Sequence, residues 1–96
     1  MTVSVIIATY RRDNSLKKAI ESALNQTYKY IEVIVVDDNA NTEWNTRVEA
    51  IVKQYPSVKY IQNKINKGSA ATRNIGIKES GGDFITFLDD DDIYLP

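Results

Sequence analysis

Four consecutive aspartates, at residues 89–92, form the part of the sequence best suited to chemistry. They directly follow residues 84–88, an apolar run rich in β-formers that predicts a buried strand ending in a cluster of carboxylates. Carboxylate oxygens are preferred ligands of Mg²⁺ and Mn²⁺, and Mg²⁺ is usually held by one or two carboxylates together with substrate phosphates. The alternative is a solvated turn, because aspartate is also favoured in turns. The tract alone leaves both interpretations open.

The residue types that are missing narrow the chemistry further. The 96-residue chain contains neither cysteine nor histidine, which excludes disulfides, thiolate metal sites, and imidazole as a general base or metal ligand. Its 12 Lys and Arg side chains nearly balance its 13 Asp and Glu side chains. It therefore lacks a global basic field, and we expect no nucleic-acid partner. The apolar stretch ending at Ala8 is too short for a secretory signal or a membrane span, so we expect a cytoplasmic protein.

The predicted elements place the aspartates at one edge of a parallel sheet. Strands are predicted at 3–9, 31–36, 58–62 and 84–88, where β-branched and other apolar residues dominate. Apolar residues recur at helical spacing over 16–24 and 44–55, Gly68 opens a third helical stretch that runs to residue 79, and a glycine pair follows at 81–82. This alternation implies right-handed crossovers onto a parallel sheet, and hence a doubly wound, three-layer α/β fold.

In folds of this kind, ligands bind outside the carboxyl ends of the strands. Here the first, second and fourth strands end in T-Y-R at 9–11, D-D-N at 37–39 and the aspartate tract. An aromatic ring, a hydrogen-bonding carboxylate and a carboxylate cluster along one crevice suit a nucleoside with a metal-bound diphosphate. Each residue also has an ordinary structural interpretation: a surface ring for Tyr10, a turn or helix cap for Asp38 and a surface ion pair for Arg73.

Four motifs, in this order and at this spacing, resemble the inverting family 2 glycosyltransferases, which have the GT-A fold. They are V-S-V-I-I-A-T-Y-R-R at 3–12, V-I-V-V-D-D-N at 33–39, N-K-G-S-A-A-T-R-N-I-G-I at 66–77 and F-I-T-F-L-D-D-D-D-I-Y-L-P at 84–96. The resemblance implies strand order 3-2-1-4 and transfer of a sugar from a nucleotide sugar, often a UDP-sugar, to a carbohydrate or lipid acceptor. It also implies Mn²⁺ or Mg²⁺ on the diphosphate, and a location at the cytoplasmic face of the membrane for the complete protein is compatible with it.

The resemblance also assigns roles to individual residues. Tyr10 is placed near the base and Asp38 at the edge of the base, whereas Asp37 is expected to hold neighbouring loops. Asp91 matches the metal ligand, with an ambiguity of one position because four aspartates are adjacent. Arg73 is expected near the diphosphate or beside the acidic cluster. The nucleotide-binding positions are Ala8, Thr9, Tyr10, Asp38, Arg73, Asp89 and Asp90.

The sequence departs from the family pattern in three respects. Thr72 stands where the family more often has alanine, and Asp90 where it often has serine. The third departure is length: in the family, the acceptor site and the catalytic base follow the aspartate motif, whereas this chain stops at Pro96. We therefore expect residues 1–96 to form a single truncated domain that binds the donor and is inactive by itself. With a sheet edge and an apolar surface exposed, it is expected either to self-associate or to be only marginally stable.

Two other classes of function remain to be weighed. A nucleotide-binding module without catalytic activity would show metal-dependent UDP binding and no hydrolysis of a UDP-sugar. A signalling receiver domain is also a parallel α/β fold with clustered aspartates, but its acidic pair should follow the first strand. In this sequence that strand ends in Thr9 and Tyr10, which disfavours the receiver interpretation.

Overall fold

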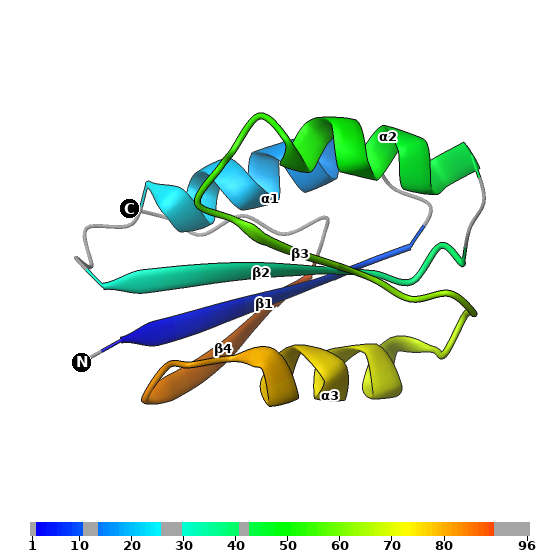
Figure 1. The fold of residues 1–96 in the computed structure, drawn as a ribbon. Coiled ribbons are helices and arrows are strands. Elements are labelled where there is room, and N and C mark those ends of the chain that lie inside the picture. The colour runs from blue at the N-terminus through cyan, green and yellow to red at the C-terminus, as the bar shows by residue number, and fades with distance from the viewer. Residues whose placement is uncertain (1, 11–13, 26–29, 41–42, 90–96) are drawn as a thin grey trace.

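The computed structural model describes residues 2–10, 14–25, 30–40 and 43–89, which form four strands and three helices in strict alternation (Figure 1). No helix in these ranges is long and apolar enough to cross a bilayer. The predicted alternation is confirmed. In chain order the elements are β1 (Val3–Thr9), α1 (Asn14–Leu24), β2 (Ile31–Asp37), α2 (Glu43–Val52), β3 (Lys59–Gln62), α3 (Ser69–Glu79) and β4 (Phe84–Asp89).

The four strands make one parallel sheet in the order β3-β2-β1-β4. Helices α1 and α2 cover one face, and α3 covers the other (Figure 1). The strand order reverses direction at β1, because the chain moves outward through β2 and β3 and then returns to place β4 on the other side of β1. The structure thus confirms a doubly wound, three-layer α/β fold with strand order 3-2-1-4.

Two apolar clusters hold the layers together, one on each face of the sheet. The larger lies under α1 and α2, and the smaller, under α3, is centred on Ile6, Ile34 and Val36. Because side chains alternate between the faces of a strand, the continuous apolar runs of β1 and β2 supply both clusters at once. The buried members of the larger cluster are Val5, Ile7, Leu16, Ala19, Ile20, Ala23, Val33, Val35, Val48, Val52, Val58 and Leu88.

Helix α3 packs closely on the sheet because it carries a glycine at the point of contact. A Cβ atom on Gly76 would lie 2.5 Å from Cγ2 of Ile6, a fully buried side chain of β1. The absence of that Cβ therefore brings the helix backbone nearer to the strand than any other residue would allow.

Helix α2 ends earlier than the apolar pattern of the sequence predicts. Its last helical residue is Val52, and Tyr55 lies beyond it. The amides of Gln54 and Tyr55 donate to carbonyls three residues back, at 3.1 and 2.9 Å, which is the tightened geometry of a closing turn. Pro56 follows, and it restricts the preceding residue to extended conformations. Tyr55 packs against the larger apolar cluster from the turn that follows α2, although its position in the sequence continues the apolar spacing of the helix.

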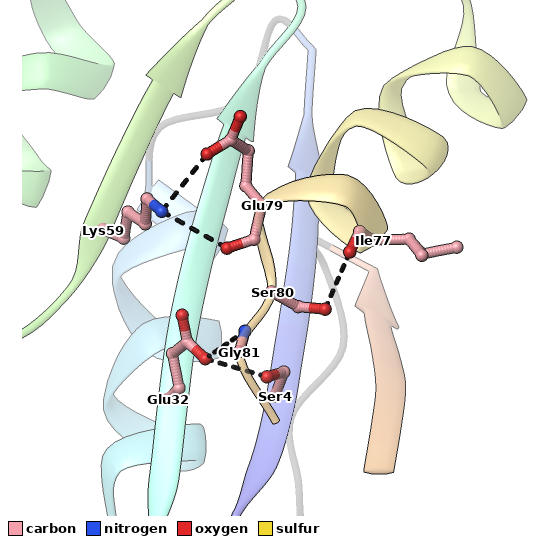
Figure 2. Close-up of polar contacts among 7 residues, drawn as sticks. All are labelled: Ser4, Glu32, Lys59, Ile77, Glu79, Ser80 and Gly81. Carbon is pink, nitrogen blue, oxygen red and sulfur yellow. Dashed lines mark hydrogen bonds and ion pairs between the residues drawn. The ribbon is translucent and has the colours of Figure 1, made fainter. Parts of the chain in front are cut away.

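At the amino ends of the strands, polar contacts fasten the end of α3 and the connection to β4 (Figure 2). The carboxylate of Glu32 on β2 accepts hydrogen bonds from the Ser4 hydroxyl at 2.9 Å and from the Gly81 amide at 3.0 Å. Lys59 of β3 contacts both the carbonyl and the carboxylate of Glu79, at 3.2 and 3.3 Å. The polar residues that end β1, β2 and β4 lie at the opposite edge of the sheet, which is formed by the carboxyl ends of the strands.

Candidate functional site

Strand β1 ends at the centre of the carboxyl edge, between the ends of its two neighbours. In the parallel registers, Thr9 pairs with Asp37 of β2, and Ala8 pairs with Asp89 of β4. Thr9 is buried, and its hydroxyl has no hydrogen-bond partner within the part of the chain that the structure describes. Tyr10, the next residue, is 45% exposed. The first strand therefore brings a buried hydroxyl and an exposed ring to the same edge.

Asp37, the last residue of β2, holds the neighbouring elements on the α2 side of the sheet. It is fully buried, and one carboxylate oxygen accepts from the backbone and side-chain amides of Asn39, at 2.9 and 2.6 Å. The other accepts from the Asn45 amide of α2 at 2.9 Å and from the Tyr60 hydroxyl of β3 at 2.5 Å. Burial, and then this hydrogen bond to a carboxylate, raise the pKa of Tyr60 far above its usual value. These contacts agree with the structural role expected for Asp37.

Asp38 makes an equally dense set of contacts on the other side, with the loop that joins β3 to α3. Oδ1 accepts from the side-chain amide of Asn63 at 2.9 Å and from the backbone amide of Lys67 at 2.8 Å. Oδ2 accepts from the side-chain amide of Asn66 at 3.1 Å and from the backbone amide of Gly68 at 3.0 Å. We call these five residues the Asp38 clamp. The clamp sets a negative charge beside the start of α3, where the helix dipole favours it.

Two asparagines of the clamp were not singled out from the sequence. Asn63 is buried, and its side-chain amide bridges Asp38 to the hydroxyl of Thr72 on α3 at 3.3 Å. Asn66 reaches both the main-chain carbonyl and the carboxylate of Asp38. Their signal in the sequence is faint, since asparagine is common in any loop. Thr72, which departs from the family pattern, therefore has a structural role here: its hydroxyl accepts a hydrogen bond from Asn63.

Arg73 lies on the face of α3 that is turned toward β4. Its guanidinium carbon is 5.9 Å from the centre of the Phe87 ring, which places a cation over an aromatic face. Phe87 stands two residues before Asp89, so Arg73 lies beside the strand that leads into the aspartate tract. The structure thus places Arg73 near β4, on the α3 side of the sheet.

The acidic tract itself is reached only at its first residue. Asp89 ends β4 and pairs with Ala8, while Asp90 and Asp91 lie outside the described residues. Within the ranges that the structure describes, no three acidic side chains form a group that could hold a metal ion. The carboxylates of the tract are chemically suitable oxygen ligands for Mg²⁺ or Mn²⁺.

The described part of this edge has the chemistry of a binding site for a small polar ligand with a ring. It combines the exposed Tyr10 ring, a buried Thr9 hydroxyl that no described residue bonds, and a loop fixed by Asp38. Such sites use an apolar or aromatic surface for contact area and a few fixed polar groups for orientation. The structure brings Ala8, Thr9, Tyr10, Asp38 and Asp89 to this one edge, with Arg73 beside β4.

Comparison with known proteins gives a family match over nearly the entire chain. The family model described as glycosyl transferase family 2 matches residues 4–96. A Campylobacter jejuni protein named GalNAc(5)-diNAcBac-PP-undecaprenol beta-1,3-glucosyltransferase is 41% identical over 94 residues, which is 97% of this chain and 30% of that protein. An Escherichia coli UDP-Glc:alpha-D-GlcNAc-diphosphoundecaprenol beta-1,3-glucosyltransferase, WfgD, is 37% identical over 97% of this chain and 36% of its own length. The chain thus spans about a third of these relatives.

Solved structures agree with the sequence match. TarS 1-349 from S. aureus, in complex with UDP-GlcNAc, superposes with a TM-score of 0.80 at 30% identity, covering 95% of this chain and 27% of the other. A mannosyltransferase from Pyrobaculum calidifontis, in complex with GDP-Man and Mn²⁺, has a TM-score of 0.81 at 21% identity, covering 96% of this chain and 28% of the other. The latter similarity concerns the fold alone.

Proposed function

Because the chain belongs to glycosyl transferase family 2, we propose that it supplies the site that binds the nucleotide sugar in a glycosyltransferase. The observation that carries the proposal is the meeting of three strand ends at one edge of the sheet, fixed by the Thr9–Asp37 and Ala8–Asp89 registers. In an open parallel sheet, a ligand binds outside the carboxyl ends of the strands, where the strand order reverses. That point lies at β1 in this fold.

Within the proposed site, one group of residues binds the nucleoside and another binds the diphosphate and ribose. Tyr10, with Ala8 and Thr9, receives the nucleoside. The support is the exposed ring of Tyr10 and the buried hydroxyl of Thr9, which has no hydrogen-bond partner among the described residues. Asp38 shapes the nucleoside end of the site from the neighbouring strand by holding the β3–α3 loop, whose amides occupy its carboxylate oxygens. The diphosphate and ribose are bound by Asp89, Asp90 and Arg73. The guanidinium would meet phosphate oxygens with charge-assisted hydrogen bonds.

A divalent cation, Mn²⁺ or Mg²⁺, belongs to the proposal, with Asp91 as its ligand. The support is chemical: four adjacent carboxylates offer only hard oxygen donors, which suit these ions. The fold neighbour from P. calidifontis was solved with Mn²⁺. When bound, such an ion supplies positive charge that balances the charge of a departing diphosphate.

For the complete protein, we propose inverting transfer of a hexose from a UDP-sugar to a lipid-linked or carbohydrate acceptor, as in polysaccharide biosynthesis. The names of the two bacterial relatives describe glucosyltransferases with undecaprenol-linked substrates, and TarS was solved with UDP-GlcNAc. The catalytic base would then lie outside residues 1–96, so these residues by themselves would bind the donor without turnover. Such an enzyme would work at the cytoplasmic face of the membrane.

A nucleotide-binding module without catalytic activity is the second candidate. It is favoured by what the described residues of the carboxyl edge supply, namely an exposed ring and a loop held by fixed hydrogen bonds, which are features of binding. The two candidates share the nucleotide site and differ in chemistry alone. Release of free sugar or transfer to an acceptor, measured with a UDP-sugar and the complete protein, separates them.

Calorimetric titration with UDP, in the presence and absence of Mn²⁺, tests the proposed site. We expect binding that depends on Mn²⁺ and that Asp91→Ala abolishes. The matched control is Asp83→Ala, which removes a carboxylate at the amino edge, where Asp83 accepts from the Thr2 amide at 3.0 Å. Equal binding by the unaltered protein and Asp91→Ala would refute the metal assignment, and absence of binding to UDP, GDP and dTDP would refute the nucleotide site.

A further inference from the structure

The hydrogen-bonding capacity of the Asp38 carboxylate is filled by a single loop. A carboxylate offers about four lone-pair positions on its two oxygens. Asn63 and Lys67 occupy Oδ1, and Asn66 and Gly68 occupy Oδ2. Each oxygen thus receives one side-chain amide and one backbone amide. Because the four donors approach both oxygens, they fix the rotation of the carboxylate group as well as its position.

Asn66 fixes Asp38 in a second way. Its side-chain amide donates to the main-chain carbonyl oxygen of Asp38 at 3.0 Å and to the carboxylate at 3.1 Å. One amide group therefore links the backbone and the side chain of the same residue, which restrains the side-chain rotamer of Asp38. The side-chain amide of Asn63 connects Asp38 to α3 through Thr72. The backbone amide of Asn63 extends the β2–β3 pairing, because it donates to the Asp37 carbonyl at 2.8 Å.

The restraint is mutual, because Asp38 also fixes the loop. The backbone amides of Lys67 and Gly68 both donate to its carboxylate, immediately before the first residue of α3. Gly68 has a φ of 86°, a conformation that favours glycine. The connection from β3 to α3 thus turns at the carboxyl edge with its path set by Asp38 (Figure 1). A site whose side chains and loop are already ordered loses less conformational freedom when a ligand binds.

From this arrangement we infer that Asn66 and Asn63 are positioning residues for nucleotide binding, acting through Asp38; this inference rests on the proposed function. They hold Asp38 and the start of α3 in the geometry that receives the nucleotide. By linkage, the coupling is reciprocal: a nucleotide that binds the ordered clamp also stabilises it.

Asn66→Ala is the variant that tests this inference. Asn66 is exposed, so the substitution removes its two hydrogen bonds without opening a cavity in the core. The matched control is Gln54→Ala, which also removes an exposed side-chain amide, one that bonds the Ala50 carbonyl at 3.4 Å on α2. Two quantities are measured for each protein: the dissociation constant for UDP with Mn²⁺, and hydrogen exchange at the amides of Lys67 and Gly68, with and without saturating UDP.

We expect Asn66→Ala to weaken UDP binding about threefold to tenfold, the range that loss of such a hydrogen bond produces. Exchange at Lys67 and Gly68 should be faster than in the unaltered protein, and UDP should slow it more in the variant than in the unaltered protein. A merely structural role for Asn66 would lower the melting temperature and leave this UDP-dependent difference unchanged. Gln54→Ala should match the unaltered protein in both measurements.

The outcomes separate this inference from the proposed function. If the unaltered protein binds UDP and Asn66→Ala binds it equally well, the inference is wrong and the proposed function stands. If exchange accelerates but UDP affinity is unchanged, the clamp orders the loop without serving the nucleotide, which also overturns the inference. If the unaltered protein binds no nucleotide, the proposed function fails, and the inference fails with it.

Discussion

Replacement of Gly82 by alanine offers a sharp test of the packing at the amino edge. Gly82 precedes β4, and its amide donates to the hydroxyl of the fully buried Ser4 at 2.9 Å. A Cβ atom on Gly82 would collide with that hydroxyl and would lie 2.8 Å from the Ser4 backbone nitrogen and 3.0 Å from the Thr2 carbonyl oxygen. Because two of these three neighbours are backbone atoms, the clash cannot be relieved by a change of rotamer.

The cost follows from two contributions. Overpacking of a close contact costs about 1–3 kcal/mol, and displacement of the Gly82–Ser4 hydrogen bond adds about 0.5–1.5 kcal/mol. We therefore expect Gly82→Ala to lower the free energy of unfolding by about 1.5–4.5 kcal/mol. For a domain of this size, each kcal/mol corresponds to about 4–8 °C, so the melting temperature should fall by at least about 6 °C.

Gly81→Ala is the internal control, because it makes the same chemical change one residue earlier. The nearest atom to its added Cβ would be a Glu32 carboxylate oxygen at 3.7 Å, an ordinary van der Waals distance, and its φ is not positive. Its effect should stay within about 1 kcal/mol, with a small gain from reduced freedom of the unfolded chain. Urea and thermal unfolding of the two variants measure the difference. Equal stability of Gly81→Ala and Gly82→Ala would refute the packing argument.

Two further predictions concern β3 and β4. The neutral hydroxyl of Tyr60 donates a hydrogen bond to the buried carboxylate of Asp37 and so stabilises the folded chain. Because the pKa of Tyr60 is raised in the folded state, this contribution to stability is complete below about pH 10 and is lost as the pH rises further. Tyr60→Phe should cost about 1.5–3 kcal/mol in neutral urea titrations and should flatten the alkaline loss of stability; an unchanged alkaline slope would contradict the assignment. On β4, the edge strand of the sheet among the described residues, Phe84 and Phe87 lie on opposite faces and are 55% and 43% exposed, so the chain should self-associate through this edge. The double variant Phe84→Ser/Phe87→Ser should lower the weight-average mass in sedimentation experiments, and a monomeric unaltered chain at high concentration would contradict the prediction.

The type of each helix and strand, and their order along the chain, could be predicted because both depend on local patterns of apolar residues. The continuous apolar runs of β1 and β2 identify strands covered on both faces, and the regular alternation with helices implies parallel pairing. The strand order came from resemblance to a family, since apolar patterns do not specify which strands become neighbours. The end of α2 was missed because Tyr55 continues the helical spacing from a turn.

The hydrogen bonds within the site could not be predicted from the sequence. In the printed chain, Asp37 and Asp38 are two identical residues in one polar turn. Their carboxylates have separate partners, because Asp37 bonds Asn45 of α2 whereas Asp38 bonds the loop before α3. These partners lie between 8 and 30 positions away along the chain, a separation at which residue type alone carries no pairing information. The same reason explains why the contacts of Asn66 with Asp38 could not be predicted from the motif that begins at Asn66.

Helix α3 is fastened at both ends, and this has a consequence for how the chain can change in length. Its start is fixed by Asp38 through the amide of Gly68, and its end is fixed at Glu79 by Lys59 and at Gly81 by Glu32. An inserted or deleted residue within the helix would rotate one end by about 100° and shift it by about 1.5 Å relative to the other. One of the two attachments would then be out of register. Homologous chains should therefore accept insertions and deletions in their surface connections and keep the eleven-residue length of this helix.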